Sequence, residues 1–444
     1  MSASRLEGYH GEILRRLTKS GVKVGSAIRL TSKSGEIFEG VLIPRSEYSD
    51  PRHIVLKMKN GYNIGISLER TEKLEVIGEG EKPHFTKPSP PPIRTGLPKV
   101  AIISTGGTIA SRVDYRTGAV QPALTAVDLA SVVPELSSIA EVDAHILFGE
   151  YSENIGPTHW KGMAEEVAKR IANGVDGVVI SHGTDTLHYT AAALSFALTN
   201  LPVPVLLVGA QRSSDRPSSD AASNLTGAVA LAARADMATV GVAMHRDLSD
   251  HIIIAHRGTR VRKCHTSRRD AFRSINSNPV ASYDLSTGQI ELTNGIAKRD
   301  KSRKPVLKSR FDQHAYLAKF YPGMNPSIID SSVSTGARGI VLEGTGLGHV
   351  SGHLFDSVKK ALKREVPVFM TSQTIWGRVD MNVYNTGRDL LNLGVTPLED
   401  MIAETAIVKL MWVAAQTKSA SKIREMMLQP IAGEITSRTL VEAS

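Results

Sequence analysis

Three short polar motifs carry hydroxyl, carboxylate and ammonium groups that could together attack a carbonyl carbon. The first is the turn Thr105-Gly106-Gly107-Thr108, within the run TGGTIAS. Its glycines let the backbone approach a ligand closely, so the turn could cradle a phosphate or present a threonine nucleophile beside oxyanion-stabilising N–H groups. No Lys-Ser/Thr pair follows the glycines, which argues against a Walker-type phosphate loop. A plain structural turn is an equal alternative.

The second motif is HGTDT, which runs from His182 to Thr186. Within it, the hydroxyl of Thr184 and the carboxylate of Asp185 could form a nucleophile–base pair or clamp a ligand. Either side chain could also cap the start of a helix. These functions are compatible, because the free N–H groups at a helix start also bind anions.

The third motif is the basic run RVRKCH, from Arg260 to His265. A partly desolvated lysine such as Lys263 can favour ionisation of a neighbouring hydroxyl, whereas most cations in such a run lie in solvent. Cys264 could be a reactive thiolate beside Lys263, although a lone cysteine more often packs as a small apolar residue. The histidines of this region lack the spacing of metal ligands, so we expect no metal site.

Short apolar runs precede the first two motifs and predict the strands that position them. These runs are residues 100–104 and 175–181, and two more follow at 204–209 and 239–244. Because such runs alternate with helical patterns, we expect right-handed crossovers and a parallel sheet with its polar loops at the carboxyl ends of the strands.

A second α/β unit begins near Asp312, with strand patterns at residues 339–343 and 366–370. The first 78 residues differ, because a helical pattern near residues 6–17 is followed by period-two segments separated by turns. They predict a helix and a small SH3- or Sm-like β-barrel. The stretch 79–98 contains six prolines and predicts a semi-rigid linker. The expected domains are therefore residues 1–78, the linker 79–98, and two α/β domains at 99–311 and 312–444.

The composition sets the broad class of protein. Of the 444 residues 41% are apolar and 22% charged, which is typical of a globular chain. The single cysteine excludes an internal disulfide framework and fits a reducing compartment. We find neither a membrane-length apolar run nor a signal-peptide pattern, so we expect a cytoplasmic protein without membrane association.

The charge is uneven along the chain. The net charge is +9, and residues 1–98 hold 16 basic against 11 acidic side chains. This excess permits an RNA partner without requiring one. A docking or dimerisation platform is equally compatible with the barrel.

Together the motifs resemble the L-asparaginase family of threonine amidohydrolases. The resemblance rests on TGGTIAS, HGTDTL and GTRVRK, with support from VLLVGAQRSSD, GIVLEGTGLGHV and GRVDMNVYNTGRDLL, and it covers about residues 99–434. It implies a two-domain asparaginase-like parallel-sheet core. It also implies hydrolysis of a primary amide through an acyl-enzyme, with release of ammonia and no metal or organic cofactor in this chain.

The resemblance assigns roles to individual residues. Thr105 matches the first nucleophile, Tyr115 the mobile-loop tyrosine that assists it, and Thr184, Asp185 and Lys263 the second catalytic set. Ser152 and Glu153 match the positions that bind the substrate's α-carboxylate and α-amino groups. The backbone at Gly106 and Gly183 would contact the substrate. Which threonine attacks first, and whether glutamine or asparagine is preferred, stay open.

The barrel and linker resemble the front of the D-subunit family of archaeal glutamyl-tRNA(Gln) amidotransferases. That family implies a glutaminase subunit (EC 6.3.5.- type) whose ammonia passes to a GatE-type partner, which uses ATP and Mg to convert Glu-tRNA(Gln) to Gln-tRNA(Gln). It also implies tRNA(Gln) as a partner and a homodimer of this chain within a heterotetramer. Two alternatives are a free-standing L-asparaginase with an accessory domain and a non-catalytic RNA-binding scaffold.

Overall fold

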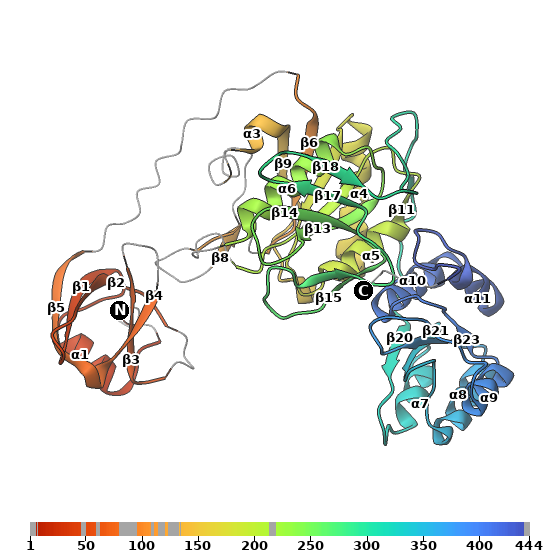
Figure 1. The fold of residues 1–444 in the computed structure, drawn as a ribbon. Helices are drawn as coiled ribbons and strands as arrows, with labels where there is room; N and C mark the ends of the chain where they lie inside the picture. Colours follow the sequence, from red (N-terminus) through yellow and green to blue (C-terminus); the bar gives the residue numbers. More distant parts are fainter. Residues whose placement is uncertain are drawn as a thin grey trace. The chain divides into compact units, whose positions relative to one another are not determined.

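A computed structural model describes residue 6 and residues 8–45, 50–58, 63–79, 96–107, 111–113, 120–122, 133, 135–212 and 219–438. The chain divides into two compact units, one of Met1–Pro90 with Ala110–Ala123 and Arg212–Ser219, and one of the remaining residues (Figure 1). Among the described helices, none has both the length and the apolar character needed to cross a bilayer.

The first unit is a curled antiparallel sheet with one helix. Its elements are α1 (Gly11–Lys19), β1 (Ser26–Ser32), β2 (Ile37–Leu42), β3 (His53–Lys57), β4 (Asn63–Ser67), the 3-10 turn η1 (Leu68–Arg70) and β5 (Thr71–Glu79). The strand order is β4-β3-β2-β1-β5. Alternate residues point inward, as with Ile28 and Leu30 of β1 and Ile54 and Leu56 of β3, all of them fully buried. This confirms the predicted small β-domain.

Helix α1 is fixed to this sheet by apolar packing and by hydrogen bonds to the backbone. Ile13 and Leu17 are buried in the same apolar cluster as the strands. The Arg16 guanidinium donates to the carbonyl oxygens of Thr71 (3.1 Å) and Glu72 (2.9 Å) at the start of β5. The helix therefore fixes the beginning of the last strand.

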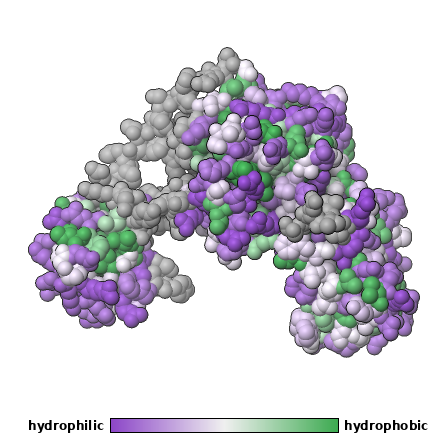
Figure 2. All heavy atoms as spheres, in the orientation of Figure 1, coloured by the Kyte–Doolittle hydropathy of each residue, from purple (hydrophilic) through white to green (hydrophobic). Residues whose placement is uncertain are grey.

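Large apolar side chains also lie on the outside of this unit. Val76 and Ile77, on β5 at one end of the strand order, are each 46% exposed. Ile37 at the start of β2 is exposed as well. Figure 2 shows hydrophobic surface on this part of the molecule.

The larger unit begins with an eight-stranded mixed sheet in the order β18-β17-β14-β13-β12-β10-β6-β9. Its strands are β6 (Lys99–Ser104), β9 (Glu141–Ile146), β10 (Gly177–Ser181), β12 (Val205–Val208), β13 (Val240–His245), β14 (Ile252–Arg257), β17 (Ala281–Asp284) and β18 (Ile290–Leu292). Its helices are α3 (Leu136–Ile139), α4 (Pro157–Ala172), α5 (Leu187–Ala197) and α6 (Ala221–Arg234). Helices α4 and α5 pack on one face and α6 on the other.

Five neighbouring strands of this sheet are parallel, as predicted, namely β9, β6, β10, β12 and β13. The other three, β14, β17 and β18, each pair antiparallel with the strand before them, which was not predicted. The connection from β13 to β14 explains the change. It spans only residues 246–251, too few for a crossover to a parallel strand, so the chain returns as a hairpin.

Two short antiparallel pairs belong to the same unit as this sheet. They are β11 (Leu198–Thr199) with β19 (Val306–Leu307), and β15 (Val261–Lys263) with β16 (Phe272–Ser274). A further pair, β7 (Ser111–Val113) with β8 (Val120–Pro122), belongs to the first unit.

The last part of the chain forms a four-stranded parallel sheet in the order β20-β21-β22-β23. Its elements are β20 (Ala315–Lys319), α7 (Ser327–Ser334), β21 (Gly339–Gly344), the turn η4 (Gly352–Leu354), α8 (Phe355–Lys363), β22 (Val368–Ser372), α9 (Asn385–Leu393), β23 (Thr396–Pro397), α10 (Ala403–Gln416) and α11 (Ala420–Leu428). The predicted second α/β unit is therefore present.

One apolar cluster of the larger unit includes residues of both sheets, and a second cluster lies within the last part of the chain. Helix α10, beside the second sheet, packs against α5 of the first, and Phe196 lies 6.0 Å from Trp412 between ring centroids. The ion pair Arg260–Asp400 (3.0 Å) joins the two parts, and both side chains are fully buried. Because breaking such a pair leaves a buried charge without its partner, the two halves are tightly coupled.

The segment after α11 connects both halves. Glu434 pairs with the buried Lys409 of α10 (2.6 Å). The Ala432 carbonyl accepts from the Thr259 hydroxyl (3.0 Å), and the Gly433 carbonyl from Arg260 Nε (3.0 Å). Residues 432–434 are therefore held by side chains of both halves.

Candidate active site

The candidate site lies where four neighbouring parallel strands end. Strands β9, β6, β10 and β12 are adjacent in that order, and the chain enters a polar loop after each. Carboxyl ends of parallel strands share one edge of a sheet, so these loops lie side by side. The TGGT and HGTDT motifs follow β6 and β10, which pair directly.

The turn after β6 is tightly packed against its neighbours. Gly106 and Gly107 have positive φ values of 113° and 81°. A Cβ on Gly107 would lie 2.6 Å from the backbone nitrogen of Gly183, and one on Gly106 would overlap the Glu150 carbonyl. Only glycine fits these two positions. Any other residue would be strained at a positive φ, and its Cβ would overlap backbone atoms that already occupy the space.

Thr105 does not present its hydroxyl to this site. The residue is fully buried, and its Oγ1 donates to the Ser181 carbonyl oxygen at 2.7 Å. The described conformation therefore gives the Thr105 hydroxyl a hydrogen bond to the neighbouring strand, and the assignment of Thr105 as nucleophile stays a prediction. Tyr115, and Thr108 at the other end of the turn, lie outside the described residues.

Thr184, Asp185 and Lys263 come together as the sequence predicted. Lys263 Nζ donates to Thr184 Oγ1 at 2.8 Å and to Asp185 Oδ1 at 2.7 Å. The Lys263 side chain is 8% exposed, whereas that of Asp185 is 71% exposed. An ammonium that donates to a hydroxyl oxygen favours the alkoxide that forms when this hydroxyl loses its proton. The arrangement can therefore supply an activated oxygen nucleophile.

The hairpin of β15 and β16 carries Lys263 to the site. Lys263 pairs with Phe272 across this hairpin, and Phe272 is fully buried. The preceding Arg262 is engaged elsewhere, since its Nε contacts Glu404 at 3.1 Å. Partial burial raises the pKa of Cys264, which opposes the alternative of a reactive thiolate beside the lysine.

The predicted substrate-binding residues lie on the turn η3 (Ser152–Asn154), after β9. Ser152 is buried against Gly183, where a Cβ would lie 2.8 Å from the Ser152 Cβ. The Thr186 hydroxyl donates to the Ser152 carbonyl at 2.5 Å. Glu153 is exposed beside this contact. The turn is thus fixed to the HGTDT loop, and the Glu153 carboxylate faces solvent.

Buried side chains that the sequence did not predict as part of the site hold the HGTDT loop by hydrogen bonds. His182 is fully buried, with Nδ1 2.7 Å from the Gly183 carbonyl oxygen and Nε2 2.9 Å from Thr190 Oγ1. Trp160 Nε1 donates to the same Thr190 hydroxyl at 3.0 Å. Thr190 follows the motif by a few residues on α5, but nothing in the sequence links it to Trp160 on α4.

A second buried network holds the loop after β12. Asn224 donates to the Gly209 carbonyl (3.0 Å) and to Asp220 (3.0 Å), while Asp220 accepts from the Gln211 N–H (3.0 Å). His245 Nδ1 lies 2.6 Å from Asn224 Oδ1. This loop touches the site, because a Cβ on Gly209 would lie 2.7 Å from Thr184 Cγ2.

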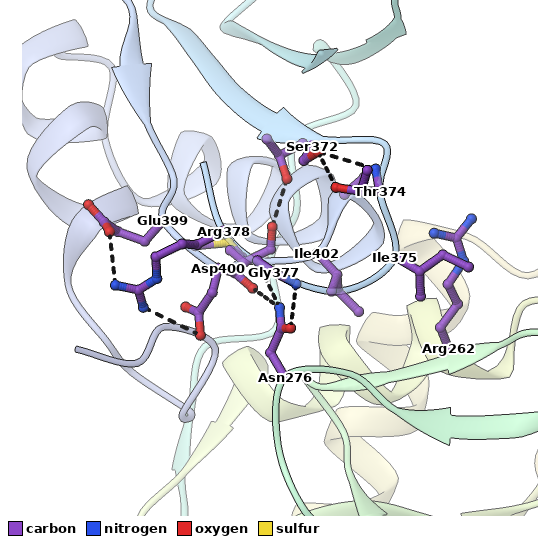
Figure 3. Close-up of a pocket in the computed structure, with 13 residues that line it drawn as sticks. Arg262, Asn276, Ser372, Thr374, Ile375, Gly377, Arg378, Glu399, Asp400 and Ile402 are labelled. Atoms are coloured by element: carbon purple, nitrogen blue, oxygen red, sulfur yellow. Dashed lines mark hydrogen bonds and ion pairs between the residues drawn. The ribbon is translucent and has the colours of Figure 1, made fainter. Parts of the chain in front are cut away.

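A separate polar pocket lies where the two halves meet (Figure 3). It encloses about 290 Å³, including space open to solvent, and its lining includes Arg262, Asn276 and Arg378. The arginines are matched by carboxylates, with Arg378 3.6 Å from Glu399 and Arg262 3.1 Å from Glu404. None of the residues predicted for catalysis lines this pocket, so we assign no chemistry to it.

No cluster of three or more histidine, cysteine, aspartate or glutamate side chains suited to a metal ion occurs within the described part of the chain. The groups that the structure does bring together near Thr184 are a hydroxyl, an ammonium and a carboxylate. This donor set suits acid–base and nucleophilic chemistry.

Three protein families match successive parts of the chain. Residues 22–77 match the "GatD N-terminal domain", residues 99–297 "Asparaginase, N-terminal", and residues 315–427 "Glutaminase/Asparaginase C-terminal domain".

Curated relatives match along nearly the whole chain. The glutamyl-tRNA(Gln) amidotransferase D subunit of Methanopyrus kandleri is 50% identical, and the match covers 97% of this chain and 95% of the relative. The D subunit of the same enzyme from Pyrococcus abyssi is 49% identical, with 95% and 97% covered.

Solved structures match the larger unit. The thermostable L-asparaginase from Thermococcus kodakarensis superposes with a TM-score of 0.68 at 33% identity, and covers 77% of this chain and 100% of its own. L-asparaginase I from Vibrio cholerae gives a TM-score of 0.65 at 27% identity, and covers 77% and 99%.

The buried histidines predict how stability depends on pH. Burial lowers the pKa of His182 to about 4 and those of His188 and His256 to about 3. In the unfolded chain each would titrate near 6.5, so below that pH the unfolded state binds more protons and the free energy of unfolding falls. The slope is at most about 1.4 kcal/mol per pH unit for each histidine, and the stabilisation is fully present above pH 6.5.

Urea unfolding at pH 7.5, 6.5, 5.5 and 5.0 measures this decrease in the free energy of unfolding, in a pH range where most carboxylates stay ionised. His256→Gln should flatten the profile, because it removes one of the three groups. A free energy of unfolding that stays constant from pH 7.5 to 5.0 would contradict the prediction.

Proposed function

The chain belongs to the family of glutamyl-tRNA(Gln) amidotransferase D subunits, and we propose that it releases ammonia from glutamine or asparagine for synthesis of Gln-tRNA(Gln). The observation that carries this proposal is the placement of Lys263 Nζ, 2.8 Å from the Thr184 hydroxyl and 2.7 Å from Asp185. A scaffold without catalysis would not need a nearly buried ammonium on a hydroxyl.

The chemistry follows from the properties of a primary amide. Its carbonyl is attacked only slowly by a neutral hydroxyl, so the attacking oxygen must be activated. Lys263 stabilises the negative charge that develops on Thr184, and Asp185 holds Lys263 in place. Attack gives a tetrahedral intermediate, and the proton lost by the Thr184 hydroxyl is transferred to the amide nitrogen. Ammonia then leaves as the C–N bond breaks, and water hydrolyses the resulting ester to the free acid.

The developing oxyanion needs hydrogen-bond donors. The N–H of Thr184 makes no hydrogen bond to any other described residue. It is therefore available to an oxygen of the substrate, in the region where Ser152 and Glu153 would hold the amino-acid end. Preorganised backbone donors of this kind act strongly because they need no reorganisation during the reaction.

We assign the remaining steps to partners. A GatE-type subunit would bind ATP and Mg, activate Glu-tRNA(Gln) and receive the ammonia, while this chain would need no cofactor. The chain would act in the cytoplasm as a homodimer within a heterotetramer. The exposed Val76 and Ile77 on β5 favour a protein contact of the barrel over a purely electrostatic contact with RNA.

Lys263→Met should lower the rate of ammonia release from glutamine by several orders of magnitude, because it removes the charge that stabilises the Thr184 alkoxide. Ammonia release by the full-length chain measures it. Arg268→Met is the matched control, since it removes a charge from the same hairpin and leaves Asp270 paired with Arg273. Equal losses in both variants would indicate a general electrostatic patch and contradict a specific role of Lys263.

Thr105→Val should change ammonia release by less than about tenfold and lower the free energy of unfolding by about 1 kcal/mol. The reason is that the lost hydroxyl bonds only the Ser181 carbonyl, which keeps the Thr105 N–H at 3.2 Å. Thr108→Val, made in parallel, tests the other hydroxyl of the same turn. A complete loss of activity in Thr105→Val with an unchanged melting temperature would contradict this expectation and support Thr105 as the nucleophile.

Deleting residues 1–94 should leave ammonia release intact and abolish coupled synthesis of Gln-tRNA(Gln) with the partner subunit. The larger unit should fold alone, because the Thermococcus kodakarensis asparaginase corresponds to 77% of this chain. Val76→Asp with Ile77→Asp should weaken partner binding in the full chain, whereas Ile37→Asp should not. Full-rate transamidation by the truncated chain would show that the barrel serves another purpose.

A further inference from the structure

His182 is the buried titratable side chain closest in sequence to Thr184, and the mechanism above does not use it. It follows β10 directly, and its backbone N–H donates to the Val208 carbonyl of β12 at 2.9 Å, which extends the strand pairing by one residue. Its side chain is fully buried, so it cannot touch a substrate in the described conformation.

The partners of His182 fix where its proton lies. The Gly183 carbonyl can only accept, so Nδ1, 2.7 Å away, must carry a hydrogen. Burial lowers the pKa of His182 to about 4, so the ring is neutral near pH 7 and Nε2 is an acceptor. The Thr190 hydroxyl, 2.9 Å away, therefore donates to Nε2 and accepts from Trp160 Nε1 at 3.0 Å.

The hydrogen bonds thus run in one direction, from Trp160 on α4 through Thr190 on α5 and His182 to the Gly183 carbonyl. Each link is buried, and each donor meets an acceptor. Thr190 is fully buried and Trp160 is 5% exposed. The positions of α4 and α5 therefore help to fix the orientation of one peptide group, the one that carries the Gly183 carbonyl.

That peptide group joins Gly183 to Thr184. In a trans peptide the C=O and N–H point in opposite directions, so a carbonyl held toward His182 turns the Thr184 N–H away from it. A glycine peptide can flip at little cost, and Gly183 must be glycine because Ser152 occupies the space of a side chain. The His182 ring holds the carbonyl of this peptide, so loss of the bond would leave the peptide freer to reorient.

We propose that His182, held as the Nδ1–H tautomer by Thr190 and Trp160, is a positioning residue that aims the Thr184 N–H at the oxyanion of the substrate. This inference rests on the amide hydrolysis proposed above. The donor is needed mainly in the transition state, so its misalignment lowers kcat and leaves KM nearly unchanged.

Two variants of His182 separate positioning from packing in the full-length chain. In His182→Asn the side-chain amide N–H takes the place of Nδ1–H and can still donate to the Gly183 carbonyl. In His182→Gln the amide lies near the position of Nε2 and cannot. We expect kcat for ammonia release to fall at least tenfold in His182→Gln and no more than about threefold in His182→Asn, with KM little changed in both.

Thr405→Val is the matched control for the loss of a buried polar bond, since the Thr405 hydroxyl donates to the Thr259 carbonyl at 2.9 Å away from the HGTDT loop. It should lower the melting temperature without lowering kcat. Equal kcat values in the two His182 variants would overturn the proposal, because a purely structural role does not distinguish Asn from Gln by donor position.

The tautomer provides a test that needs no variant. In the parent protein labelled with ¹⁵N-histidine, His182 should show a protonated Nδ1 and an unprotonated Nε2 at pH 7. An Nε2–H tautomer or an imidazolium would overturn the proposal even if the His182 variants do not fold. A parent protein that releases no ammonia would instead refute the proposed function, and the tautomer could still be measured.

Discussion

The contact between the backbones of two turns, those after β6 and β10, is the constraint on which the rest of the site depends. Strands β6 and β10 pair in parallel, so their turns leave the sheet side by side. Gly107 lies so close to the His182–Gly183 backbone that no side chain fits between them. Across the same pair of strands, the Thr105 hydroxyl donates to the Ser181 carbonyl. In the described conformation the Thr184 hydroxyl thus meets Lys263, while the Thr105 hydroxyl bonds the neighbouring strand.

Around this contact, elements remote in sequence supply the charges and the supports. Lys263 lies on the hairpin of β15 and β16, and Ser152 lies on the turn after β9. The supports beneath them are neutral, because the buried histidines are uncharged near pH 7. The charge that acts on Thr184 therefore comes from Lys263 and its partner Asp185, without competition from a buried cation in the supporting network.

The sequence predicted those parts of the structure that depend on local pattern. Apolar runs followed by polar turns predicted β6, β10 and the loops of the site, and the motif types predicted the meeting of Thr184, Asp185 and Lys263. Three features were not predicted, two because they depend on tertiary contacts and one because it depends on the length of a connection. The direction of the Thr105 hydroxyl follows from the neighbouring strand, the antiparallel strand β14 from the length of one connection, and the support of His182 from two helices packed together.

The segment that carries Glu434 has a consequence for how the protein is made. Its carbonyls accept from Thr259 and Arg260, and its carboxylate meets Lys409, so both halves of the larger unit close around it. During translation the ribosome exposes the first sheet long before this segment. Lys409 and Arg260 therefore lack these partners until synthesis has passed residue 434, so the contacts between the two halves are completed only near the end of translation.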